Sequence, residues 1–140
     1  MSAPHIDHIG IIVSDLEQAV AKLRLLFGED ITIRELPDAG LRVAEFHAAN
    51  VVIELLQYTG GSESAFARQV MGERIGLNHI SARVEDVGRS VAELTAAGFT
   101  PMQGFPRWGA HGRVAFFEPD RVSGLLFEVC RPDMAGPHAG

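Results

Sequence analysis

The stretch Leu77–Asp86 reads Leu-Asn-His-Ile-Ser-Ala-Arg-Val-Glu-Asp, and it decides the fold because the chain contains a version of it twice. The earlier stretch, Ile6–Asp15, reads Ile-Asp-His-Ile-Gly-Ile-Ile-Val-Ser-Asp. When the two are superposed, His79 falls on His8, 71 residues earlier. Each stretch has the apolar, β-branched character of a strand and ends in a polar turn. This self-similarity predicts a fold built from one duplicated unit.

Bulk composition predicts a folded protein and argues against nucleic acid as a partner. Hydrophobic residues make up 46% of the chain and charged residues 21%, which supports a core. The formal net charge is −6 without a basic tract, whereas nucleic-acid-binding proteins carry basic patches. The single cysteine, Cys130, precludes a disulfide within the chain, as is typical of a reducing compartment. No signal peptide or membrane-length apolar run stands out, so we expect a cytoplasmic protein with no membrane partner.

The first copy is predicted to form a strand, a helix and three further strands, in a module of about residues 4–57. A capping box at Ser14 and Glu17 opens the helix, which runs to about Phe27 with apolar residues on one face. The strands are apolar-rich runs bounded by turn residues. They are expected at Ile6–Val13, Ile31–Glu35, Leu41–His47 and Val51–Gln57.

The second copy repeats this order over about residues 77–131, and the whole chain is expected to be one domain. The linker, residues 58–76, should contain a short helix at Ala65–Met71. Glu85 or Asp86 caps the helix of this module, and Phe105–Gly112 is predicted to be a loop interrupted by Gly and Pro. Residues 132–140 form a tail. Strands are expected at Asn78–Val84, Phe99–Met102, Val114–Glu118 and Leu125–Cys130.

Each copy also carries a glutamate within its last apolar strand. Glu54 follows His8 by 46 residues, and Glu128 follows His79 by 49. An ionised carboxylate on a half-buried strand is costly unless it is paired or binds a metal. Two imidazoles and two carboxylates suit a divalent ion such as Co²⁺, Mn²⁺, Ni²⁺ or Zn²⁺. Each residue taken alone would more often be a core histidine or a surface glutamate, but the repeated pattern favours a four-ligand metal site.

These motifs resemble those of the vicinal oxygen chelate superfamily, also called the glyoxalase/bleomycin-resistance fold. The resemblance covers roughly residues 4–131 and implies an α+β fold, in which two paired βαβββ modules form a cup-shaped, mostly antiparallel sheet around a metal site. Within the superfamily the chain looks most like the methylmalonyl-CoA epimerases. The stretches that carry the resemblance are His5–Gly10, Val52–Leu56, Gly76–Ile80, Gly109–Phe116 and Gly124–Glu128.

The resemblance implies a metal-dependent isomerase. It implies His8, Glu54, His79 and Glu128 as ligands of a divalent ion, Co²⁺ being favoured. It also implies that Glu45 and Glu128 act as acid and base at the carbon between a thioester and a carboxylate, so that (R)- and (S)-methylmalonyl-CoA, or a close acyl-CoA, interconvert. The metal would stabilise the enolate as a Lewis acid, and a homodimer is expected by the same analogy. Arginines that can meet substrate carboxylate or phosphate are Arg42, Arg83, Arg107 and Arg113.

Departures from the epimerase pattern leave other functions open. Epimerases carry His-Pro-Lys where this chain has Glu118-Pro119-Asp120, and paired histidines where it has Asn78-His79. A lactoylglutathione lyase-like enzyme uses the same type of site, and Glu54 suits it at least as well. A ring-cleaving dioxygenase needs only two histidines and one carboxylate. A non-catalytic binding protein of this fold is a further alternative, although such proteins commonly lack the metal residues.

Overall fold

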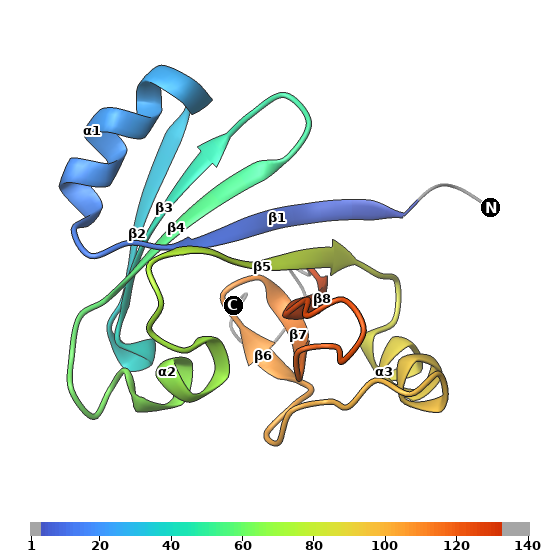
Figure 1. Ribbon diagram of the computed structural model, residues 1–140. Helices are drawn as coiled ribbons and strands as arrows, with labels where there is room; N and C mark the ends of the chain where they lie inside the picture. Colours follow the sequence, from blue (N-terminus) through green and yellow to red (C-terminus); the bar gives the residue numbers. More distant parts are fainter. Residues whose placement is uncertain (1–3, 133–140) are drawn as a thin grey trace. The chain divides into compact units, whose positions relative to one another are not determined.

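The computed structural model describes residues 4–132 of the chain (Figure 1). These residues divide into two compact units. The first unit is residues 8–79, and the second unit is residues 4–7 together with residues 80–132. The chain passes from the first unit to the second within strand β5 (Gly76–Arg83), so His79 is the last residue of the first unit. Most of the predicted tail, residues 132–140, lies outside the described residues.

Four strands of the first unit lie in the order β2-β3-β4-β1. Strands β2 and β3, and likewise β3 and β4, pair in antiparallel fashion, whereas β1 and β4 are parallel. The four predicted strands are therefore present, and none of their ends differs from the prediction by more than one residue. Their bounds are β1 (His5–Ile12), β2 (Ile31–Leu36), β3 (Leu41–His47) and β4 (Val52–Tyr58).

Helix α1 (Leu16–Phe27) lies along one face of these strands (Figure 1). Its N-cap is Asp15, whose Oδ1 accepts a hydrogen bond from the amide of Gln18 at 3.0 Å. The predicted capping box at Ser14 is therefore wrong, because the carboxylate one residue later satisfies the exposed amide of the first turn. The apolar face of α1 packs as predicted. The buried residues of this cluster are Leu16, Ala44, Phe46, Ile53 and Leu55.

The opposite face of the same strands carries a second apolar cluster and the candidate site. Ile12, Leu41, Val43 and Leu56 form its buried part, and Ala67 and Met71 of helix α2 (Ala65–Met71) pack against it. Side chains alternate between the faces of a strand with period two. The site residues therefore share this face with the buried residues of the cluster. On β3 and β4 a site residue lies two positions from a buried residue, and on β1 it lies four positions away. The site residues are Glu45 beside Val43, Glu54 beside Leu56, and His8 on the strand of Ile12.

The second unit repeats the arrangement with strands in the order β5-β8-β7-β6. Helix α3 (Val87–Ala96) begins at the N-cap Asp86, as predicted, and its Val87 is buried with Ala115, Phe117 and Val129. Strands β6 and β7, and β7 and β8, are antiparallel, whereas β5 and β8 are parallel. The new bounds are β6 (Arg107–Gly109), β7 (Gly112–Phe117) and β8 (Phe127–Arg131).

One predicted strand of the second unit is wrong. Phe99–Met102 makes only an isolated bridge, Pro101 to Phe117, with one backbone hydrogen bond on each side of it, from the amide of Met102 to Phe116 and from the amide of Glu118 to Thr100. The amide of Phe99 donates instead to the carbonyl of Leu94 in α3 at 3.0 Å, so the start of this segment still belongs to the helix end. The second strand of this module is instead β6, which lies in the predicted loop and forms a hairpin with β7 in which Gly109 is opposite Gly112.

The element order confirms the predicted α+β fold of two βαβββ modules. β1, α1, β2, β3 and β4 form the first module, and β5, α3, β6, β7 and β8 form the second. In each module two of the three strand pairings are antiparallel. Within residues 4–132, every helix is too short or too polar to span a membrane.

Candidate metal centre

Three of the four predicted metal ligands gather in the first unit. His8, Glu54 and His79 each offer one ligand atom, and these atoms lie within 4.8 Å of one another. The three residues are almost fully buried, with 1%, 3% and 5% of their surface exposed. The rings of His8 and His79 meet edge to face with centroids 5.6 Å apart. The histidines of the two sequence copies therefore converge on one point.

Strand pairing explains how Glu54 reaches the histidines. In the parallel pair of β1 and β4, Gly10 is the register partner of Glu54, and His8 is two residues away on the same face of β1. His8 Nε2 lies 3.9 Å from Glu54 Oε1. That separation is longer than a hydrogen bond, whereas two metal–ligand bonds of about 2.1 Å each can bridge it.

Gly10 leaves the space that the ring of His79 occupies. A Cβ atom placed on Gly10 would lie 2.7 Å from His79 Nε2 and 2.8 Å from His79 Nδ1. Any larger residue would collide with the ring, because non-bonded heavy atoms pack at about 3.5–4.0 Å. An isolated glycine inside a strand marks such a close approach.

Glu45 lies beside this group on strand β3. It is the direct cross-strand partner of Glu54, so the two carboxylates share one face of the sheet. The Glu45 side chain is 12% exposed, and its Oε2 lies 3.5 Å from a guanidinium nitrogen of Arg34 on β2. Like charges directly opposite each other destabilise a sheet. Arg34 offsets the negative charge of Glu45, and a cation bound near Glu54 would offset the negative charge of Glu54.

The donor set fits a divalent ion of the first transition series. Imidazole nitrogen suits Co²⁺, Ni²⁺ and Zn²⁺, and carboxylate oxygen suits Mn²⁺ as well. The buried group supplies two nitrogens and one carboxylate, and Gly10 keeps one ring in place. A buried, negatively charged carboxylate is expensive unless a positive charge compensates it. The residues present therefore fit the ion that the sequence predicts.

Glu128, the fourth predicted ligand, lies in the second unit on strand β8. It is 5% exposed and is the register partner of Ser81 on β5 and of Phe116 on β7. The carboxylate is thus buried within a strand, as the apolar neighbours in the sequence predicted. The burial of Glu128 parallels that of Glu54 in the first unit.

Several other polar residues singled out in the sequence have structural roles. Arg42 binds two carboxylates, Glu17 at 2.6 Å and Glu35 at 2.9 Å. Arg83 donates to Asp7 at 2.7 Å, and Arg113 stacks over the ring of Trp108. These arginines are therefore partly occupied by neighbours in their own unit.

Cys130 is buried on β8 and packs in the core. Burial raises the pKa of its thiol from 9.0 to about 12. The thiolate, which is the nucleophilic form, is therefore scarce at neutral pH.

Three residues of the site were not singled out by sequence reasoning: Gly10, Arg34 and Asn78. Gly10 interrupts an isoleucine-rich strand, and that signal could have identified it. Arg34 and Asn78 carry no such signal, because Arg34 acts on a charge of a neighbouring strand and Asn78 acts through hydrogen bonds to α2 and to His79. Asn78 Oδ1 lies 2.8 Å from Nδ1 of His79.

Comparison with known proteins identifies the family of this chain. A family model for the glyoxalase/bleomycin resistance protein/dioxygenase superfamily matches residues 7–117. An ethylmalonyl-CoA/methylmalonyl-CoA epimerase from Cereibacter sphaeroides is 32% identical over 127 residues, which is 89% of this chain and 95% of the relative.

Solved structures share the fold over nearly the whole chain. A hypothetical protein from Bacillus halodurans C-125 superposes with a TM-score of 0.78 and 27% identity, covering 94% of this chain and 96% of the other. A variant of the Streptomyces coelicolor methylmalonyl-CoA epimerase, in complex with 2-nitronate-propionyl-CoA, gives a TM-score of 0.71 and 26% identity over 93% of this chain and 98% of its own. With its two βαβββ modules and a match over residues 7–117, this chain belongs to the glyoxalase/bleomycin resistance protein/dioxygenase superfamily.

Proposed function

We propose that this protein is a metal-dependent epimerase that interconverts the (R) and (S) forms of methylmalonyl-CoA or a close acyl-CoA. The observation that carries the proposal is the buried group of His8, Glu54 and His79 with a further carboxylate, Glu45, on the adjacent strand. The epimerase relatives described above support the choice of substrate.

In this proposal a divalent ion is held by His8, Glu54 and His79, with Glu128 as the fourth ligand. Glu128 is supported by its burial and by its place in the repeat, where it corresponds to Glu54. When bound, the ion supplies Lewis acidity that favours negative charge on the substrate oxygens. Co²⁺ is the favoured ion. The homodimer and the cytoplasmic location stay predictions.

The chain's own residues move the proton. The carboxylate of Glu45 removes the hydrogen from the carbon between the thioester and the carboxylate of the substrate. The electron pair of the broken C–H bond passes into the enolate of the thioester. Glu128, in its acid form, returns a proton to the opposite face of that carbon. Glu45 thus gains the proton that Glu128 loses, and the reverse reaction or exchange with water restores both.

Arg34 has a supporting part in this proposal. Its guanidinium lies 3.5 Å from Glu45 Oε2 and can hold that carboxylate in one orientation. The near-complete burial of His8, Glu54 and His79 keeps water from their side chains. A general base works only within hydrogen-bond reach of the proton that it removes, so a fixed orientation of Glu45 favours transfer.

Proton NMR of methylmalonyl-CoA in D₂O tests the proposal. With Co²⁺-loaded protein we expect the signal of the α-proton to disappear, and we expect a chelator to prevent that loss. Retention of the signal by protein with bound metal would contradict the epimerase. The hemithioacetal of glutathione and methylglyoxal is the alternative substrate for the same experiment, and its turnover would indicate a lactoylglutathione lyase-like enzyme instead.

A further inference from the structure

We infer that Asn78 is a positioning residue that fixes the tautomer of His79 and so presents Nε2 as the metal-binding nitrogen. The inference rests on the proposed function, since it assigns a role around the same metal group. Its evidence is a chain of two hydrogen bonds. Asn78 Nδ2 donates to the carbonyl oxygen of Met71 at 2.8 Å, and Asn78 Oδ1 lies 2.8 Å from His79 Nδ1.

The first hydrogen bond determines which way the amide of Asn78 faces. A carbonyl oxygen such as that of Met71 only accepts, so the amide nitrogen must face it and the amide oxygen must face His79. An amide oxygen also only accepts, so His79 Nδ1 must carry the hydrogen. In a neutral imidazole the other nitrogen then has the lone pair. Nε2 of His79 is therefore the nitrogen able to bind a metal ion.

The amide offers an advantage over a charged partner at this position. Metal-binding histidines commonly donate their second N–H to a fixed acceptor, which sets the tautomer and the ring orientation. An amide oxygen does this without adding another negative charge to a site that already holds Glu45 and Glu54. Gly10, which lies against the ring, restricts its position further.

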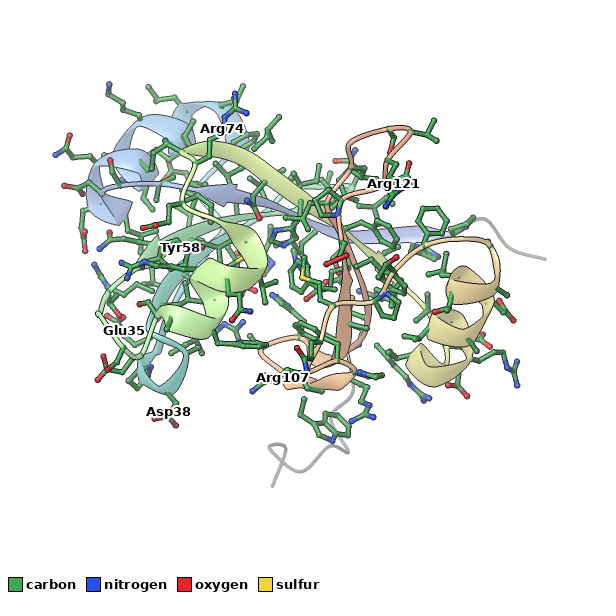
Figure 2. The ribbon with its side chains drawn as sticks, turned by 60° about the horizontal axis from the view of Figure 1, so that its bottom comes forward. Glu35, Asp38, Tyr58, Arg74, Arg107 and Arg121 are labelled. Atoms are coloured by element: carbon green, nitrogen blue, oxygen red, sulfur yellow. The ribbon has the colours of Figure 1, made fainter. Side chains whose placement is uncertain are left out.

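The carbonyl of Met71 is itself fixed, because it ends helix α2. Met71 packs against the apolar cluster that contains Ile12 and Leu56. Tyr58, labelled beside α2 in Figure 2, donates from its hydroxyl to the carbonyl of Gly72, the C-cap of the same helix. The linker helix between the two sequence copies thus holds Asn78, and Asn78 holds the histidine of the second copy.

Nitrogen NMR of ¹⁵N-histidine-labelled, metal-free protein tests the tautomer directly. We expect long-range ¹H–¹⁵N correlations to show His79 with its hydrogen on Nδ1, the signals being assigned by their loss in His79→Gln. A wild-type His79 with its hydrogen on Nε2 would overturn the inference. This measurement needs no metal, so it stands even where the epimerase proposal fails.

Metal affinity, measured by calorimetric titration with Co²⁺, gives the second readout. Asn78→Leu removes both hydrogen bonds and is expected to lose the tautomer preference and to weaken binding by about 10- to 100-fold. Asn78→Asp keeps an acceptor for Nδ1 and is expected to retain the tautomer. Gln18→Leu is the matched control, since it also replaces a side-chain amide that donates a hydrogen bond, here to Asp15 at the start of α1, and its affinity should stay at the wild-type value.

The outcomes separate the two hypotheses. A folded Asn78→Leu variant with unchanged Co²⁺ affinity and unchanged tautomer would overturn the inference and leave the metal site in place. An equal loss of affinity in Gln18→Leu would also overturn it, because general loosening of the protein would then explain the effect. Wild-type protein that binds no divalent ion would contradict the proposed function, while the tautomer measurement would still decide the role of Asn78.

Discussion

Glu45 and Glu54 are the same kind of residue at directly opposed positions of β3 and β4, yet their surroundings assign them different chemistry. Glu54 is almost fully buried beside two imidazoles. Glu45 is slightly more exposed and has a guanidinium for a neighbour. A carboxylate surrounded by nitrogen ligands suits metal binding, and one at the margin of that group suits proton transfer.

Replacing Glu45 with glutamine is expected to separate proton transfer from metal binding. The amide keeps the size of the side chain and cannot take a proton, and general bases contribute about 10²- to 10⁴-fold to rate. We expect turnover of methylmalonyl-CoA to fall by at least about 100-fold while bound Co²⁺ stays at the wild-type ratio. Glu35→Gln, a change at an exposed glutamate on β2, is the matched control. Turnover that survives in Glu45→Gln with metal bound would contradict the assignment.

Replacing Gly10 with alanine tests the space reserved for His79. The added methyl would collide with the imidazole, so the ring must move away from His8 and Glu54. We expect Co²⁺ affinity to fall by roughly 10-fold or more, as for other residues that orient ligands, with the fold retained by circular dichroism. Gly61→Ala is the control, because nothing lies within 4 Å of a Cβ at that position. Equal affinities in both variants would refute this role for Gly10.

How far the site could be predicted from sequence depends on what each residue does. His8, Glu54 and His79 were identifiable because the duplication marks them twice and because charged groups in apolar strands need an explanation. That His8 and Glu54 come together follows from the pairing of β1 with β4, and sequence periodicity does not specify which strands pair. Arg34 acts through a charge on a neighbouring strand and Asn78 through hydrogen bonds to α2 and to His79. Neither has a local sequence pattern that distinguishes it from other polar residues.

At the scale of elements, the duplication predicts structure more accurately than local motifs do. Asp15 and Asp86 occupy equivalent positions in the two copies, and both are N-caps with nearly the same backbone, φ −140° and ψ 106° against φ −142° and ψ 106°. The capping box at Ser14 was a sound local motif that the structure does not use. The misplaced strand at Phe99–Met102 arose similarly, because an apolar run suggested a strand where the structure has only an isolated bridge.

The two caps give a quantitative prediction. Each aspartate accepts a hydrogen bond from a first-turn amide at 3.0 Å, and replacing such a cap with alanine costs about 1 kcal/mol. We expect Asp15→Ala and Asp86→Ala each to lower the free energy of unfolding by that amount in urea titrations. Ser14→Ala should leave it unchanged. If Ser14→Ala lowered the free energy of unfolding more than Asp15→Ala does, Ser14 and not Asp15 would be the functional cap.

At the scale of the whole molecule, a ligand that binds only the folded state couples the metal site to global stability. A divalent ion at 100 times its dissociation constant would add about 2.7 kcal/mol to the free energy of unfolding. For a chain of this size that corresponds to a rise in Tm of roughly 5–10 °C. The increase depends on every residue that holds the ion, so thermal unfolding reports on ligands from both halves of the sequence.

Thermal unfolding with and without Co²⁺ therefore tests the fourth ligand. Glu54→Ala is expected to abolish most of the metal-induced rise in Tm, because it removes the carboxylate of the buried group. Glu128→Ala should reduce the rise to a similar extent, since the proposal gives both glutamates the same role. Glu118→Ala, an exposed glutamate just after β7, should keep the full rise. A Glu128→Ala variant that retains it would show that the ion needs only His8, Glu54 and His79, and Glu128 would then keep only its proposed role as proton donor.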